Sequence, residues 1–292
     1  MNASILLNLT LRGLTTGAVY ALVGMGIVLI LQTTNVMNFA QGDTGMFITY
    51  LAFFMITTAR VPYSLVLILT IAAGAVVGLI IERFLMRSVR SRSHLSLIML
   101  TLGVSMVFQG LAAFLFNTEP RLFPPLVSGD PVQLGPVVLS RQDIVVLLAT
   151  IVVFGILYLF LYRSKQGAAA RSISQDEYAA RVLGIPTPSI YMLVWAIGSA
   201  LAGLAALLTV PRFSLEPSFM GLIQVKAFSA IVLGGMDSVF GAAVGGLIIG
   251  VVENLVAYQF PAIKDSFMLI IVVIVLLVLP QGLFGKRQQR RF

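Results

Sequence analysis

The sequence contains no cysteine and a single histidine, His94. Disulfides, thiolate metal sites and metal clusters of cysteine with histidine are therefore excluded. Nucleophilic pairs that need a histidine beside a cysteine are excluded for the same reason. No glycine-rich phosphate loop of the form G-x-x-x-x-G-K-[ST] occurs. We therefore expect the chain to bind no cofactor, metal or nucleotide itself and to have no catalytic residues.

Charged residues are scarce as well. They make up 10% of the 292 residues, whereas 59% are hydrophobic and the mean hydropathy is +1.01. Soluble domains carry about 25% charged residues and could not bury this much apolar surface. A lipid bilayer accommodates it, because lipid replaces water around the outer faces. The net charge of +8 comes from basic residues between apolar stretches, which indicates membrane topology and not nucleic-acid binding.

Long apolar stretches are what the sequence has in abundance. A helix needs about 20 apolar residues to cross a bilayer. Seven stretches satisfy this: 5–31, 64–86, 95–116, 143–162, 190–210, 238–258 and 266–284. Two weaker stretches, 38–58 and 219–235, are shorter or carry polar residues and indicate broken, tilted or re-entrant helices. We therefore predict an all-α, polytopic transmembrane helix bundle of eight or nine spans, formed by residues 1–292 as a single domain.

The first stretch contains Arg12, and no basic residue precedes it. We therefore expect it to be retained as a span and not cleaved as a signal peptide. Glycine pairs spaced by four, which let helix backbones approach closely, are typical of such a bundle. They are Gly13/Gly17, Gly74/Gly78, Gly241/Gly245 and Gly246/Gly250.

The basic residues predict the orientation of the spans. Three clusters hold 12 of the 19 lysines and arginines: Arg83, Arg87, Arg90 and Arg92; Arg163, Lys165, Arg171 and Arg181; and Lys286, Arg287, Arg290 and Arg291. The positive-inside rule assigns all three to the cytoplasm. The segment 117–142 has balanced charge and five prolines, so we assign it to the outside. Nine crossings with the N-terminus outside and the C-terminus cytoplasmic satisfy these assignments, and eight remain if one weak stretch does not fully cross.

The cytoplasmic stretch 163–189 is long for a loop between packed helices, where about 2–8 residues are usual. Ser174 with Glu177 three residues later matches a capping box, which predicts a short helix over about 175–183. Gly184 would end this helix, and Pro186 and Pro188 would prevent its resumption. Two interpretations remain open: a helix lying on the membrane surface without a partner, and a helix that docks into a groove of a cytoplasmic subunit.

Four stretches resemble one known family. DEYAARVLGIPTPSIYMLVWAIGSALAGLAALL, which begins within 163–189, closely resembles the coupling region of permeases in branched-chain amino-acid ABC importers. GLTTGAVYALVGMGIVLILQTTNVMNFAQGD, AFSAIVLGGMDSVFGAAVGGLIIGVVEN and LVLPQGLFGK resemble that family's first helix with its polar turn, its late glycine-rich hairpin and its C-terminal signature. The matches span nearly the whole chain in the expected order. The chain is identified as a member of this family, similar to its shorter, LivH-type permeases.

The resemblance implies a permease subunit that forms half of the translocation pathway in a bacterial inner membrane. Its implied partners are a second, related permease, two cytoplasmic ATPase subunits that use ATP and Mg, and a periplasmic substrate-binding protein. A heterodimer of permeases is the usual arrangement, and a homodimer remains open. ATP-driven closure of the ATPases would move the coupling helix and switch the open side of the cavity. The coupling candidates are Asp176, Glu177, Ala180, Leu183, Gly184 and Ile185.

Polar residues within the apolar stretches are the candidates for the translocation path, because such groups are costly in lipid unless they line water or find partners. Asn38, Gln41 and Asp43 lie either at a broken helix near the path or at an interfacial turn. Lys226 and Glu253 are expected to form an ion pair, of structural or path-lining function. Tyr20 either lines the path or packs.

Two other classes of function fit the sequence less well than an ATP-driven importer. A secondary transporter would concentrate ionisable groups near the membrane midplane, and this chain has few acidic residues there. An intramembrane enzyme would need a zinc-ligand pair or a serine with a histidine partner, and neither pattern occurs. The sequence leaves the substrate open among branched-chain and other amino acids, amides, urea and aromatic acids.

Overall fold

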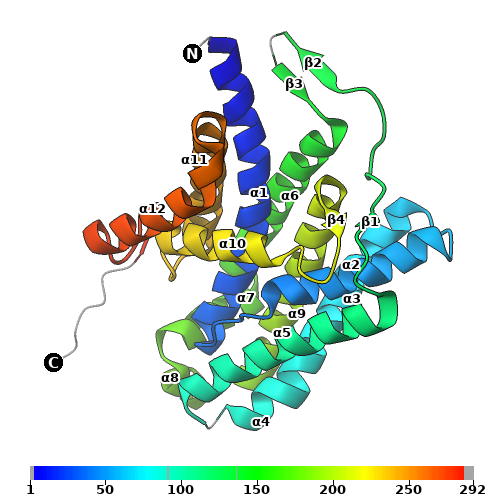
Figure 1. Ribbon diagram of the computed structural model, residues 1–292. Coiled ribbons are helices and arrows are strands. Elements are labelled where there is room, and N and C mark those ends of the chain that lie inside the picture. The colour runs from blue at the N-terminus through cyan, green and yellow to red at the C-terminus, as the bar shows by residue number, and fades with distance from the viewer. Residues whose placement is uncertain (1–2, 91, 136, 286–292) are drawn as a thin grey trace. The chain divides into compact units, whose positions relative to one another are not determined.

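A computed structural model describes residues 3–90, 92–135 and 137–285 (Figure 1). The described chain is mainly helical, as predicted. Seven of its helices are long and apolar enough to cross a membrane: Ser4–Thr34, Tyr63–Val89, His94–Phe116, Arg141–Arg163, Thr187–Arg212, Val239–Gln259 and Pro261–Val278. They coincide with the seven strong stretches of the sequence. The two weaker stretches form shorter helices, α2 (Gln41–Thr57) and α10 (Gly221–Gly234).

The described chain comprises two compact units, each assembled from separate stretches of sequence. Unit 1 contains residues 3–28, 127–151 and 223–285, and unit 2 contains residues 29–126 and 152–222. Two helices, α1 (Ala3–Thr34) and α6 (Arg141–Arg163), have one part in each unit. The prediction of a single domain stays a prediction.

Unit 2 is organised around α9 (Thr187–Thr209), against which α2 and α3 (Tyr63–Ile80) pack. Between Ile81 and Met86, α3 continues as a π-helical segment, η1, and then as the short α4 (Arg87–Val89). The remaining elements of unit 2 are α5 (His94–Phe116), α7 (Lys165–Gln175), α8 (Glu177–Val182), the 3-10 turn η2 (Val210–Arg212) and the antiparallel strands β1 (Arg121–Leu122) and β4 (Ser214–Leu215).

A core cluster in unit 2 fixes the position of Trp195. This side chain is fully buried among apolar residues of α1, α3 with its η1 continuation, and α5. The buried members are Ile30, Val36, Ala40, Ile81, Met86, Leu97, Val104 and Trp195. Between helices in a bilayer, such a cluster is stabilised by close van der Waals packing and not by exclusion from water.

In unit 1, α1 packs against α11 (Val239–Gln259) through the predicted glycines. A Cβ atom on Gly13 would lie 2.6 Å from the Cα of Val251, and one on Gly250 would lie 2.2 Å from the backbone nitrogen of Gly17. Side chains at these positions would push the helices apart. The spacing of four therefore marks a true close contact between two helix backbones.

The other elements of unit 1 are the strands β2 (Val132–Leu134) and β3 (Val137–Leu139), the turn η3 (Pro261–Ile263) and α12 (Lys264–Val278). The two strands pair antiparallel, and the amide of Val138 donates to the Asn8 side chain of α1 at 2.9 Å. No helix occurs among the described residues between Phe116 and Arg141, as the prolines predict.

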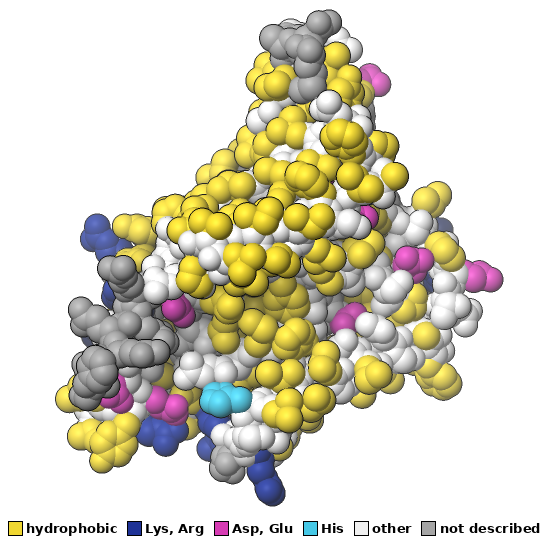
Figure 2. All heavy atoms as spheres, turned by 60° about the vertical axis from the view of Figure 1, so that its left-hand side comes forward, with side chains coloured by type: hydrophobic (Ala, Val, Ile, Leu, Met, Phe, Trp, Pro, Cys, Tyr) yellow, Lys and Arg dark blue, Asp and Glu magenta, His cyan; other side chains and the backbone are white. Residues whose placement is uncertain are grey.

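Apolar side chains cover most of the face seen in Figure 2. Many large ones are exposed on α5, α6 and α12, including Met106, Phe114, Ile151 and Leu277. Exposed apolar helix faces of this extent are stable in lipid and not in water. The chain is a multi-pass membrane protein.

Candidate functional site

The stretch predicted as a cytoplasmic loop, 163–189, folds into two short helices. The side chain of Ser164 caps α7 by accepting from the Gly167 amide at 2.9 Å. A Cβ atom on Gly167 would lie 2.0 Å from the carbonyl oxygen of Phe160, so glycine permits the tight turn from α6 into α7. A helix at 165–175 was not predicted, because its residues are mostly small and polar; its buried face consists of Gly167, Ala170 and Ile173, at intervals of three residues.

The cap of α8 differs from the prediction. Asp176, and not Ser174, is the N-cap: its carboxylate accepts from the Ala179 amide at 2.9 Å. The capping-box pattern was misleading because Ser174 belongs to α7. A carboxylate at a helix N-terminus also interacts favourably with the helix dipole.

The end of α8 was predicted correctly. Gly184 adopts φ +80°, a left-handed conformation that costs glycine little. The Gly184 amide donates to Arg181, and the Ile185 amide donates to Ala180, each at 3.0 Å. These two bonds form a Schellman motif. They stop the helix sharply and lead the chain through Pro186 into α9.

Among the predicted coupling residues, Leu183 is exposed and Ala180 is buried, with exposed fractions of 79% and 2%. Asp176 and Gly184 are exposed, and Glu177 and Ile185 are partly buried. Two large apolar residues on α8 were missed: Tyr178 and Val182, which are 79% and 70% exposed. Their spacing of four residues on a helix was visible in the sequence. With Leu183 they form an exposed apolar surface, called here the α8 surface.

The polar residues after α1 lie in a break between two helices. α1 ends at Thr34 and α2 begins at Gln41. Asn38 and Gln41 are fully buried, and the Asn38 amide donates to the Gln41 side chain at 2.9 Å. The Gln41 amide in turn donates to the carbonyl of Gly198 in α9 at 2.7 Å. These bonds satisfy groups that would otherwise be costly in an apolar environment.

Asp43 has a different set of partners from Asn38 and Gln41. Its carboxylate accepts hydrogen bonds from Ser105 and, at 3.0 Å, from Gln109, both on α5. Asp43 is buried, whereas Gln109 is exposed. The cluster therefore ties α2 to α5 and reaches the surface of unit 2.

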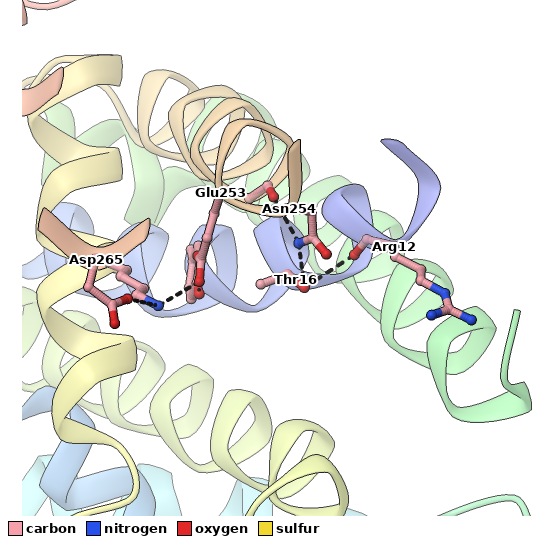
Figure 3. A network of polar contacts seen from close by, with 8 residues as sticks. Arg12, Thr16, Glu253, Asn254 and Asp265 are labelled. Carbon is pink, nitrogen blue, oxygen red and sulfur yellow. Dashed lines mark hydrogen bonds and ion pairs between the residues drawn. The ribbon is translucent and has the colours of Figure 1, made fainter. Parts of the chain in front are cut away.

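In unit 1, Tyr20, Lys226 and Glu253 meet in one cluster, and the predicted ion pair is confirmed. Lys226 Nζ lies 2.6 Å from Glu253 Oε1, and the Tyr20 hydroxyl donates to Glu253 Oε2 at 2.7 Å. A residue that was not predicted, Asp265 at the start of α12, lies 3.0 Å from Lys226 Nζ. Figure 3 shows the dashed contacts that reach Glu253 and Asp265.

A ladder of hydrogen bonds also joins α1 and α11 beside the ion cluster. Asn254 donates to the Thr16 hydroxyl at 3.4 Å, and Thr16 donates to the Arg12 carbonyl at 3.2 Å (Figure 3). The Arg12 side chain points away from the ladder. Asn254 of the ladder and Glu253 of the ion cluster are consecutive residues of α11, so α1 and α11 are joined by polar bonds as well as by glycine contacts.

The six candidate path residues therefore form two groups, one within each unit. Tyr20, Lys226 and Glu253 share one cluster of unit 1, and Asn38, Gln41 and Asp43 belong to unit 2. Each group has intramolecular partners that account for its burial. A role in lining the path stays a prediction for both groups.

Comparison with known proteins shows which family the sequence matches. Residues 9–279 match the family described as branched-chain amino acid transport system / permease component. The high-affinity branched-chain amino acid transport system permease protein BraD of Pseudomonas aeruginosa is 32% identical over 94% of each chain. The corresponding protein LivH of Escherichia coli is 29% identical, also over 94% of each chain. A solved structure, PsaBC from Streptococcus pneumoniae in complex with Fab, covers 91% of this chain and 89% of its own with a TM-score of 0.47 and 14% identity.

Proposed function

Because the chain belongs to the family of branched-chain amino acid transport system permease components, we propose that it forms half of the membrane pathway of an ATP-driven importer. The observation that carries this proposal is the family match over residues 9–279, which includes nearly all of the described helices. The cargo that we propose is a branched-chain or related amino acid, the cargo named for BraD and LivH.

The α8 surface supports the proposed coupling to a separate ATPase. Tyr178, Val182 and Leu183 expose most of their area on a helix whose ends are fixed by Asp176 and Gly184. An exposed apolar cluster on a short, stiff helix suits insertion into a hydrophobic groove of a partner. In this proposal two cytoplasmic ATPase subunits bind ATP and Mg, and the permease itself binds neither.

The proposed mechanism is a transmitted rigid-body movement. Closure of the ATPases displaces α8, which leads directly through Pro186 into α9. Movement of α9 tilts the helices packed against it and changes the side on which the pathway opens. A second, related permease completes the pathway, and a periplasmic binding protein delivers the substrate.

The proposed location is the cytoplasmic membrane, with the N-terminus and segment 117–142 outside. The basic clusters around Arg87 and Arg171 then face the cytoplasm together with α8. The third basic cluster of the sequence, Lys286 to Arg291, lies outside the described residues.

The test is affinity purification of the tagged chain from its native membrane, with mass spectrometry of the subunits that accompany it. The purified complex is then placed in liposomes with ATP inside or outside, and uptake of radiolabelled leucine is measured with and without the accompanying receptor. We expect two ATPases, a second permease, and uptake that requires ATP on the α8 side. Purification of this chain alone, with solute movement driven by an ion gradient in ATP-free vesicles, would establish a secondary carrier instead.

A further inference from the structure

A partly buried arginine, Arg90, connects α9 with the π-helical segment that continues α3. Arg90 lies just after α4, and its Nη2 atom is 3.2 Å from Oε1 of Glu82 in η1. The guanidinium carbon of Arg90 lies 3.6 Å from the ring centroid of Tyr191 in α9. Glu82 and Tyr191 are both buried. Stacking on an aromatic ring while pairing with a carboxylate uses the planar, forked shape that distinguishes arginine from lysine.

The same tyrosine reaches α8. Glu177, the first residue of α8, interacts electrostatically with both Tyr191 and Arg90, and it also pairs with Arg181 one turn later. Glu177, Tyr191, Arg90 and Glu82 thus form a continuous polar chain, called here the Arg90 chain. It joins three elements, α8, α9 and η1, all of which belong to unit 2.

Beyond the Arg90 chain, α3 and α9 are in direct backbone contact. Thr70, Gly74, Gly78 and Glu82 follow one another at intervals of four residues, as do Tyr191, Trp195, Ser199 and Gly203. A Cβ atom on Gly78 would lie 2.2 Å from the carbonyl oxygen of Trp195. Helices packed this closely cannot slide past one another without breaking the contact, so α3 and α9 form one stiff pair.

The segment η1 gives this stiff pair a point at which it can adjust. π-Helical turns within α-helices are rare and occur frequently at functional sites. Glu82 lies in η1, and its Oε2 atom is buried without a hydrogen-bond partner among the described residues. A spare acceptor beside the Arg90 guanidinium allows the pair to exchange one hydrogen bond for another while the charges stay together.

We propose that Arg90 is the positioning residue that transmits movement of α8 to the α3–α9 pair, through Tyr191 and Glu177 on one side and Glu82 on the other. The inference rests on the proposed function of α8 as the docking helix. Arg90 contacts neither cargo nor nucleotide in this scheme. Its function is to make the three elements move together.

Two variants in the complete reconstituted complex test this proposal. Tyr191→Phe keeps the ring under Arg90 and removes only the hydroxyl that reaches Glu177. The double variant Arg90→Gln with Glu82→Gln removes both charges, so that no buried carboxylate is left without its partner. Arg92→Gln, an exposed arginine of the same basic cluster, is the matched control. ATP hydrolysis stimulated by loaded receptor and substrate uptake are measured in the same vesicles.

We expect both variants to assemble with the ATPases and hydrolyse ATP, but to spend about tenfold more ATP per substrate imported, a size usual for coupling between sites. Arg92→Gln keeps the wild-type ratio. Wild-type ratios in Tyr191→Phe and in the double variant would overturn the function assigned to Arg90, because neither the Tyr191 hydroxyl nor the Arg90–Glu82 ion pair would then be needed for coupling. A wild-type complex without ATP-dependent uptake would instead refute the proposed function, so the two failures are distinguishable.

Discussion

At the scale of single residues, the ion cluster of unit 1 shows how charges are tolerated among apolar helices. Lys226 faces two carboxylates, Glu253 at 2.6 Å and Asp265 at 3.0 Å, and Tyr20 donates to the other oxygen of Glu253. An isolated buried charge is unfavourable by several kcal/mol, and a hydrogen-bonded pair offsets most of this cost. The cluster therefore stabilises the contacts among α1, α10, α11 and α12.

This pairing predicts the outcome of a charge swap. Lys226→Met leaves Glu253 without a positively charged partner and should reduce stability by about 3–5 kcal/mol, whereas Glu253→Met leaves Lys226 paired with Asp265 and should reduce stability less. The swapped variant Lys226→Glu with Glu253→Lys should recover part of this loss. The measurement is the thermal unfolding temperature in detergent, with Lys264→Met as the control outside the cluster. A swapped variant no more stable than Lys226→Met would contradict a structural pairing.

The α8 surface and the buried Ala180 lead to different expectations. Val182→Asp places a charge on the exposed apolar surface and should abolish co-purification of the ATPase while the permease stays folded in the membrane. Ala180→Asp places a carboxylate in a packed position and should abolish coupling by displacing α8 itself.

Both variants are compared with Leu122→Asp, since Leu122 is 88% exposed on β1 in the segment assigned to the outside. ATPase retention and ATP-dependent uptake are the measurements. Survival of transport in Ala180→Asp and Val182→Asp would mean that the partner docks elsewhere.

At the scale of elements, close helix contacts depend on where glycine faces another backbone. Gly250 of α11 faces Gly17 of α1, whereas a Cβ atom on Gly155 of α6 would meet nothing within 4 Å. The sequence shows both residues simply as glycines in apolar helices. Only the tertiary contact separates a required glycine from a replaceable one.

Leucine substitution at these two glycines tests that distinction. Gly250→Leu should separate α1 from α11 and destabilise the protein by at least about 1–3 kcal/mol, the usual cost of overpacking. Gly155→Leu should leave stability unchanged or raise it, because leucine has the higher helix propensity. Yield of monodisperse protein and its unfolding temperature are measured in detergent. Equal behaviour of the two variants would argue against the contact between α1 and α11.

At the scale of the whole molecule, orientation in the membrane follows from the distribution of basic residues. The absence of cysteine makes a direct test convenient, because any introduced cysteine is unique. Ser128→Cys lies in the segment assigned to the outside, and Ser174→Cys lies in α7 on the assigned cytoplasmic side. Both positions are exposed.

With a membrane-impermeant maleimide, Ser128→Cys should be labelled in intact spheroplasts and Ser174→Cys only after permeabilisation. The cysteine-free parent chain is the control for background labelling. The reverse pattern would invert the topology and would place α8 on the wrong side for an ATPase.

The sequence alone determined the seven long apolar helices, the proline-rich segment between α5 and α6, the glycine at the end of α8 and the pairing of Lys226 with Glu253. These features depend on residues that are consecutive, or on the strong need of a buried charge for an opposite charge. Local patterns were insufficient for the cap of α8, where Ser174 and Asp176 are equally suitable by residue type.

Tertiary structure decided the rest. Asp265 as a third member of the ion cluster, the burial of Ala180 beside an exposed Val182, and the chain from Glu177 to Glu82 through Tyr191 and Arg90 join residues on different helices. Such contacts depend on the rotation and packing of each helix against its neighbours. Hydropathy determines that a helix is present, but shape complementarity between side chains determines which of its faces meets which partner.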